Sequence, residues 1–203
     1  MRRDWKGTGQ PIRDIRVADS PADERGGEVA ALKAKAIEAF RILNSFVGDL
    51  VAGTRSLELF ESPGFSSRLD QNVQRVLRRM CLSHLVITLS KWAELYDRYK
   101  VVIPKNARGA CRDLHKEIKN RGIIDFRNTV VGHIWDSNLK RPLMPNEIEN
   151  RLTRVFGDSQ ASFLSWINNP QNNVFPNTVI SVCEHTRDRI KTQHGLQSSE
   201  IFS

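Results

Sequence analysis

Apolar residues recur at steps of three and four through most of this chain, and that spacing limits what the chain can fold into. Between Glu28 and Gly53 these residues are Val29, Leu32, Ala36, Phe40, Leu43, Val47 and Leu50. Such a period places them on one face of a helix. We therefore expect a long helix here, preceded by an extended N-terminal arm over residues 1–27. A loop should follow over Thr54–Ser67, where Pro63 and Gly64 favour a turn.

The same spacing continues beyond that loop. It predicts helices over residues 69–98, 107–118, 146–167 and 177–191, and the apolar segment 123–134 suits a helix better than a strand because its neighbours are helical. No alternation of period two is sustained in the sequence. The expected fold class is all-α, an antiparallel bundle of about five or six helices over residues 28–195, with a C-terminal tail over residues 196–203.

The chain carries a formal net charge of +8, and the surplus lies in one stretch. Residues 68–121 hold thirteen basic and five acidic side chains, whereas the segments before and after them are balanced. Arg75, Arg78 and Arg79 form the densest basic run in that stretch. Such a run can be a solvated helix face, or it can attract a phosphate backbone such as that of RNA, in which case these three arginines would be substrate-binding residues.

Several common kinds of site are absent from the sequence. It contains no GxxxxGK[ST] or GxGxxG phosphate loop and no HExxH or GxSxG catalytic motif, and its three cysteines lack CxxC spacing. We therefore expect neither a metal nor an organic cofactor. No apolar run approaches the roughly 18 residues that a membrane span needs, and no apolar region follows Met1–Lys6 as in a secretory signal. We expect a cytoplasmic protein without membrane contact.

One segment, Asp125–Asp136, places an arginine, a polar residue directly after it and a histidine six positions on within an apolar frame. These residues are Arg127, Asn128 and His133. The pattern resembles the R-x(4–6)-H motif of the HEPN superfamily, small α-helical bundles of which many are metal-independent ribonucleases of toxin–antitoxin and abortive-infection systems. The resemblance implies an endoribonuclease with Arg127, His133 and Asn128 as catalytic residues and a 2′,3′-cyclic phosphate product. It further implies a homodimer with a composite cleft and, for a toxin or phage-defence protein, an antitoxin as partner.

The chemistry of these side chains suits RNA cleavage without a metal. An imidazole titrates near neutrality and can move a proton from the 2′-hydroxyl or to the leaving oxygen. A guanidinium can donate two parallel hydrogen bonds to the charged phosphorane-like transition state. Six positions on a regular helix leave two side chains about 120° apart. Arg127 and His133 can therefore meet only if the helix breaks near Gly132, or if two copies pool their residues across a two-fold axis.

Other interpretations stay open at this point. Arg187-Asp188 before His194 satisfies the same pattern, although its frame is polar. In a purely structural arrangement, Arg127 would pair with Asp125 and His133 would bond to Asp136. The bundle would then be a non-catalytic adaptor that binds nucleic acid or an acidic protein partner.

The remaining histidines, aromatic residues and cysteines are expected to serve packing. His84 and Trp92 lie on the apolar face of the helix over residues 69–98 and should be core residues, whereas His115 should lie on the surface. The cysteines, Cys81, Cys111 and Cys183, should fill space in the core.

Overall fold

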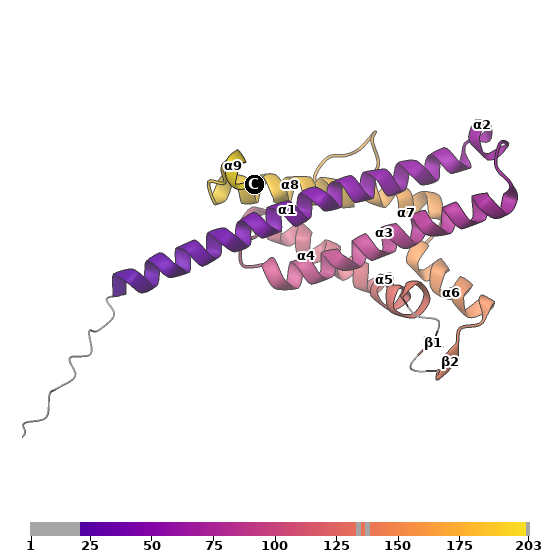
Figure 1. Cartoon of the computed structure of the whole chain (residues 1–203), viewed down its shortest axis with the longest axis horizontal. Helices are drawn as coiled ribbons and strands as arrows, with labels where there is room; N and C mark the ends of the chain where they lie inside the picture. The colour runs from indigo at the N-terminus through magenta and orange to yellow at the C-terminus, as the bar shows by residue number, and fades with distance from the viewer. Residues whose placement is uncertain (1–20, 133–134, 137–138, 202–203) are drawn as a thin grey trace, which may run out of the picture.

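The long helices α1 (Pro21–Glu61) and α3 (Gln71–Tyr99) organise the fold. They lie side by side and antiparallel in the computed structural model, which describes residues 21–132, 135–136 and 139–201, with the short helix α2 (Pro63–Ser66) at the turn between them (Figure 1). Helix α8 (Val179–Gln193) also packs against α1, and α4 (Lys105–Asn120) packs against both α3 and α8. The described chain is therefore an all-α bundle, as the sequence predicts. Among its helices, none combines length with enough apolar side chains to cross a membrane.

The buried face of α1 repeats every seven residues. Ala36, Leu43, Leu50 and Leu57 are all buried, and a seven-residue repeat keeps one line of side chains against neighbouring helices. Thr54 falls within this stripe, and its hydroxyl donates to the Leu50 carbonyl at 2.9 Å. Because Thr54 is satisfied inside the helix and Leu57 belongs to the core, α1 continues to Glu61. The expectation of a loop from Thr54 onward is wrong for these residues.

Helix α1 also begins earlier than expected. Its first residue is Pro21, which suits a first turn because no backbone N–H is required there. The end of the predicted N-terminal arm therefore moves from residue 27 to residue 20. The rest of that arm, residues 1–20, lies outside the described residues.

The second half of the chain contains more breaks than the sequence predicts. The helix expected over residues 146–167 is two helices, α6 (Pro145–Phe156) and α7 (Gln160–Ile167). Gly157 separates them with a φ of 69°, a left-handed conformation that glycine adopts without a steric cost.

The segment expected as a helix over residues 123–134 is helical but irregular. It consists of the short helix α5 (Ile123–Phe126) and a π-helical turn, η1 (Arg127–Val131). A small antiparallel pair of strands follows, β1 (Trp135–Asp136) and β2 (Arg141–Pro142), which the sequence pattern does not predict.

The expected C-terminal tail is in part a bundle element. Residues 198–201 form α9 (Ser198–Ile201), and Ile201 is buried. Arg41 of α1 donates to the carbonyl oxygens of Ile201 and Glu200, both at 2.9 Å, and Lys33 pairs with the Glu200 carboxylate at 2.6 Å. These contacts attach α9 to α1. Residues 202–203 lie outside the described part of the chain.

Gly53 allows α1 and α3 to approach closely. A Cβ atom at this position would lie 2.6 Å from Cδ2 and 3.0 Å from Cγ of Leu85, a fully buried side chain that has no room to swing away. We expect G53A to lower the free energy of unfolding by about 1–2 kcal/mol, because overpacking outweighs the gain in helix propensity. Urea unfolding followed by circular dichroism measures the change.

Gly48 in the same helix provides the matched control. No atom would lie within 4 Å of a Cβ placed there. G48A should therefore raise the free energy of unfolding by about 0.5–1 kcal/mol through helix propensity alone. If both substitutions stabilise the protein equally, the approach of α1 and α3 does not depend on Gly53.

Candidate functional site

The residues of the R-x(4–6)-H pattern begin on the π-helical turn η1. The backbone N–H of Gly132 donates to the carbonyl of Arg127 at 2.8 Å, which is the i to i+5 bond of a π-helix. That bond places Gly132 one turn above Arg127, and the helix ends there. His133 is the next residue along the chain, and it lies outside the described residues. Single π-helical turns occur frequently at functional sites in proteins.

Arg127 and Asn128 are bonded to each other on this turn. The Arg127 Nε donates to the Asn128 Oδ1 at 3.0 Å, and the Arg127 Nη1 donates to the Glu94 Oε1 of α3 at 2.9 Å. The Arg127 side chain is about one-third exposed. The structural alternative that paired Arg127 with Asp125 is wrong, because the carboxylate that Arg127 contacts belongs to Glu94.

Arg151 of α6 joins the two sides of the segment that contains His133. Its guanidinium donates to the Thr129 hydroxyl on η1 and to the Asp136 Oδ2 on β1, the latter at 2.8 Å. The Asp136 side chain is completely buried, and its other oxygen accepts from the Leu139 N–H at 2.9 Å. One side chain therefore fixes the chain four residues before His133 and three residues after it. His133 lies outside the described residues, so the alternative in which it bonds to Asp136 stays a prediction.

A concave surface of about 430 Å³ lies beside Arg151, and we call it the polar hollow. Its lining consists of Gly122, Asp125, Phe126, Asn128, Thr129, Arg151 and Arg154. Arg154 follows Arg151 by three positions on α6, and its Nε donates to the Asn120 carbonyl at 3.1 Å. The Thr129 hydroxyl donates to the Asp125 carbonyl at 2.7 Å, so the donors that the polar hollow offers a phosphate are the Asn128 amide nitrogen and two guanidinium groups, beside the carboxylate of Asp125.

Arg151 and Arg154 are site residues that the sequence reasoning missed. Net charge along the sequence does not reveal these two arginines, because Glu147 and Glu149 balance their charge. The signal that would have found them is their spacing, since residues three apart lie on the same side of a helix.

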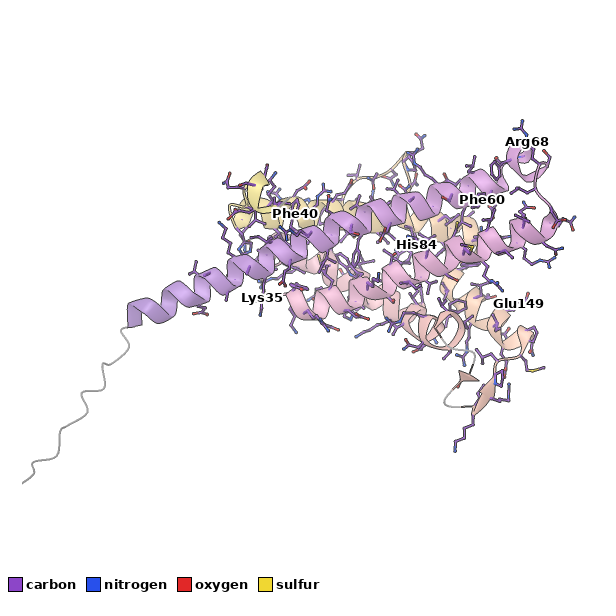
Figure 2. All side chains as sticks on the ribbon, in the orientation of Figure 1. Lys35, Phe40, Phe60, Arg68, His84 and Glu149 are labelled. Carbon is purple, nitrogen blue, oxygen red and sulfur yellow. The ribbon has the colours of Figure 1, made fainter. Side chains whose placement is uncertain are left out.

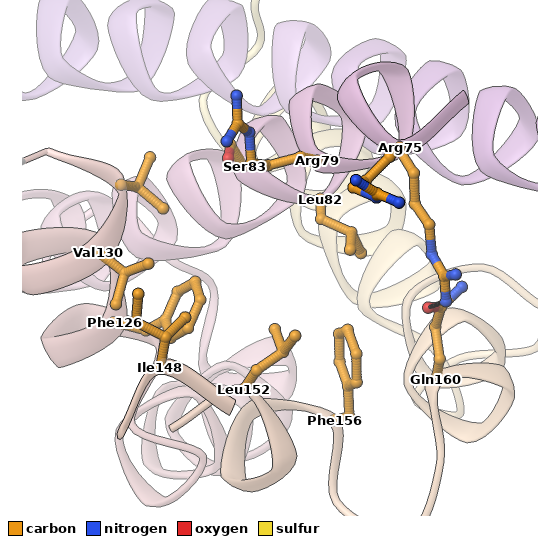
Figure 3. A pocket seen from close by; sticks show the side chains of 12 residues that line it. Arg75, Arg79, Leu82, Ser83, Phe126, Val130, Ile148, Leu152, Phe156 and Gln160 are labelled. Atoms are coloured by element: carbon orange, nitrogen blue, oxygen red, sulfur yellow. Dashed lines mark hydrogen bonds between the residues drawn. The ribbon is translucent and has the colours of Figure 1, made fainter. Parts of the chain in front are cut away.

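The predicted substrate-binding arginines occupy a different concavity. Arg75, Arg78 and Arg79 are exposed on α3. They line a cavity of about 310 Å³ that we call the arginine-rimmed hollow (Figure 3), together with Leu82, Ser83, Phe126, Val130, Val131, Ile148, Leu152, Phe156 and Gln160. Phe126 lines both hollows. The structure therefore brings the basic run and the motif segment close together without placing the three arginines and Asn128 in one cleft.

The burial of two histidines is the reverse of what the sequence predicts. His84, expected in the core, has a side chain that is 47% exposed, and its Nε2 lies 3.3 Å from the Asp49 carbonyl between α3 and α1 (Figure 2). His115, expected on the surface, is buried and meets the ring of Tyr96 edge-on, with centroids 4.8 Å apart. Trp92 is buried in the core as predicted.

The buried thiols give no sign of catalytic chemistry. Cys111 and Cys183 are buried as expected, whereas Cys81 is only half-buried. Burial raises the pKa of Cys111 to about 11, so this thiol stays protonated at neutral pH and is a poor nucleophile. Across the described residues, no group of three His, Cys, Asp or Glu side chains is arranged to hold a metal ion.

Comparison with known proteins yields one informative structural likeness. No protein-family model matches the chain, and no curated protein matches it. A solved structure from the mobile metagenome of V. paracholerae, the integron cassette protein Vpc_cass2, superposes with a TM-score of 0.62 and 26% sequence identity. The match covers 78% of this chain and 96% of the other. The helical fold is thus one that an integron cassette protein also adopts.

The ion pair between Arg151, whose side chain is about one-third exposed, and the buried Asp136 generates a stability prediction. R151A removes the guanidinium that lies 2.8 Å from the buried Asp136 carboxylate, so we expect the free energy of unfolding to fall by about 3 kcal/mol. R154A removes an exposed guanidinium from the same helix and should cost less than about 1 kcal/mol. The double variant R151A/D136N should recover part of the loss, because the amide does not need a cation. Equal effects of R151A and R154A in urea unfolding would contradict the importance of this ion pair.

Burial of His115 generates a pH prediction. Desolvation, reinforced by Lys119 and opposed by Asp97, lowers the pKa of His115 below the ordinary value of 6.5. The unfolded chain therefore binds a proton at this histidine more readily than the folded chain does, and stability is lost as the pH falls below about 6.5. H115F should flatten the decrease in the free energy of unfolding between about pH 7 and pH 5. H84F, which leaves His115 in place, should retain that decrease.

Proposed function

We propose that the protein is a metal-independent endoribonuclease of the HEPN type, acting on RNA in the cytoplasm. The observation that carries this proposal is the arrangement around Arg151. That one side chain bonds to Thr129 and Asp136 on either side of His133, and it lines the polar hollow together with Asn128. A catalytic histidine needs a segment that is held in one place relative to the phosphate it acts on. The contacts of Arg151 supply such an anchor for both sides of this segment.

In the proposed mechanism, His133 transfers the proton. It removes the proton from the 2′-hydroxyl, or gives one to the leaving 5′-oxygen, as the 2′-oxygen attacks the phosphorus and the 5′-oxygen departs. The products are a 2′,3′-cyclic phosphate and a free 5′-hydroxyl. Arg127 stabilises the charge that gathers on the non-bridging oxygens, and Asn128 orients Arg127 through their 3.0 Å hydrogen bond.

Electrostatics favours a nucleic acid as the substrate, and the 2′-hydroxyl chemistry of the proposed mechanism specifies RNA. Arg151 and Arg154 line the polar hollow beside Asn128, and Arg75, Arg78 and Arg79 extend the positive surface along α3. Binding that depends on these groups should weaken as the salt concentration rises, since each phosphate contact releases bound counterions.

The proposal includes a homodimer and a role in defence. Two copies would pool their catalytic residues across a two-fold axis, as the resemblance implies, and an antitoxin would restrain a toxic member of such a pair. The structural neighbour Vpc_cass2 is described as an integron cassette protein of a mobile metagenome. A gene carried on mobile DNA suits a toxin or phage-defence protein.

One observation favours a second candidate, a non-catalytic adaptor. The Arg127 guanidinium already bonds to Glu94 and Asn128, so a phosphate must displace the Glu94 carboxylate to reach it. An adaptor would need Arg127 only as a contact between η1 and α3. It would bind nucleic acid or an acidic protein through Arg75 and Arg79, and charge reversal of these two residues would abolish binding whereas changes at Arg127 and His133 would not.

The decisive experiment is RNA cleavage in the presence of EDTA. Purified protein is incubated with single-stranded RNA and transfer RNA, and the product ends are identified. We expect cleavage that leaves 2′,3′-cyclic phosphate ends and is slowed at least about 100-fold by H133A. R127K should slow cleavage about 10-fold or more, because an ammonium cannot replace the two parallel hydrogen bonds of a guanidinium.

The second match to the sequence pattern provides the control. Arg187 bonds to Asp188 at 2.8 Å and to Asn44 at 3.2 Å, and the His194 Nε2 lies 3.2 Å from the Val102 carbonyl. These contacts are structural, so H194A should cut RNA at the wild-type rate. Wild-type protein and H133A that cleave equally in EDTA would refute the assigned mechanism.

A further inference from the structure

The arginine-rimmed hollow is lined by apolar side chains that RNA cleavage does not use. Ile148, Leu152 and Phe156 follow one another at successive turns of α6. Leu152 and Phe156 point across the hollow toward Leu82, and Ile148 lies beside Phe126 (Figure 3). Helix α6 packs against α5 and α7, whereas α3 packs against α1, α4, α5 and η1. The hollow therefore lies between α3 and α6 and is closed on a third side by α5 and η1.

This apolar surface is left partly open to solvent. Every fully buried residue of α3 lies from Leu85 onward, and the first half of the helix packs against the core through the half-buried Cys81 and Leu82. Leu82, Leu152 and Phe156 are only half-buried. Apolar side chains gathered in a concavity but still in contact with water favour the binding of an apolar group, which would remove them from water.

The rim of the same hollow carries unneutralised positive charge. Arg75 and Arg79 stand one helical turn apart, a spacing at which like charges repel each other. Within the described part of the chain, the carboxylate paired with this rim is that of Glu61, which lies 3.5 Å from the Nε of Arg78, and no carboxylate pairs with Arg75 or Arg79. The sequence of α3 contains no acidic residue between Asp70 and Glu94. An anion at the mouth of the hollow would relieve this repulsion.

The remaining polar groups of the hollow argue against a nucleobase as its occupant. The Gln160 Oε1 accepts from Arg78, and its Nε2 donates to Glu61 at 2.7 Å, so both ends of this amide are engaged. Among the described lining residues, Ser83 supplies the other uncharged polar side chain. A base would bury ring donors and acceptors against aliphatic side chains without partners, which costs free energy. A hydrocarbon chain carries no such groups.

We propose that the arginine-rimmed hollow is a binding site for a small amphiphilic anion. Its hydrocarbon chain would lie against Leu82, Phe126 and Leu152, and its carboxylate would bond to Arg75 and Arg79. The volume of about 310 Å³ is at the lower end of the range for small-molecule sites, which suits one chain of moderate length. The site goes beyond the proposed ribonuclease function and does not depend on it.

Isothermal titration calorimetry with decanoate tests the proposal. Two further probes with the same chain length, decan-1-ol and decyltrimethylammonium, separate the contribution of the carboxylate from that of the chain. We expect one decanoate to bind per protein chain, at least about 10-fold more tightly than the alcohol and more tightly still than the cation. Equal affinities for decanoate and decan-1-ol would overturn the proposal, because the arginines would then play no part.

Variants locate the site. R75Q/R79Q should weaken decanoate binding at least about 10-fold while leaving decan-1-ol binding unchanged. L152W should weaken binding of both by filling the hollow, provided that circular dichroism shows a native helical content. The matched control R55Q/R189Q removes two exposed arginines elsewhere on the surface and should bind decanoate as the wild type does. A loss of affinity in this control equal to that in R75Q/R79Q would mean that decanoate responds to net charge alone, which contradicts the proposal.

One further variant separates this site from RNA cleavage. Arg127 faces Glu94 and does not line the hollow. R127K, which should slow cleavage, should therefore bind decanoate with wild-type affinity. If the wild-type protein does not cleave RNA but decanoate still binds through Arg75 and Arg79, the proposed function fails and the ligand site stands. If RNA is cleaved and decanoate does not bind, the reverse holds.

Discussion

The seven-residue stripe along α1 is the constraint on which the rest of the structure depends. Burying Leu43, Leu50 and Leu57 is worth about 1.5–3 kcal/mol for each side chain, and it requires two helices, α3 and α8, along one side of α1. Gly53 lets α3 approach at Leu85. Once α3 is held in this way, its C-terminal half enters the core and its N-terminal half projects toward α6. The arginine-rimmed hollow follows from that geometry.

The candidate catalytic segment depends on a smaller contact in the same manner. Helix α5 and the turn η1 pack on α3, and α6 packs on α5, so Arg151 of α6 can reach both Thr129 and Asp136. The Arg151 guanidinium and the Leu139 N–H both offset the cost of burying the Asp136 carboxylate. The bundle thus supplies a rigid frame, and two ion pairs, Arg151–Asp136 and Arg127–Glu94, connect that frame to the segment with the R-x(4–6)-H pattern.

The regular helices could be predicted from the sequence because burial of one helical face fixes the spacing of apolar residues. The breaks could not, since a single glycine with positive φ at Gly157 ends a helix that the apolar pattern would continue. Nor does the pattern say which neighbour covers a helical face. His84 lies on a part of α3 that is only partly covered, and His115 is covered by Tyr96. The π-helical turn at Arg127 has no sequence signature of its own, so the geometry of the motif emerges only in the fold.

The Phe126 side chain separates the arginine-rimmed hollow from the polar hollow, so the two sites can influence each other's affinity. Its ring is 6% exposed and belongs to the lining on both sides. An occupant of the arginine-rimmed hollow that moves this ring also reshapes the polar hollow. Coupling between two sites is reciprocal, so a phosphate in the polar hollow would alter the affinity for an amphiphile by the same factor as the amphiphile alters the affinity for the phosphate. Through this one side chain, the concentration of the amphiphile would change the affinity for RNA, and RNA would change the affinity for the amphiphile.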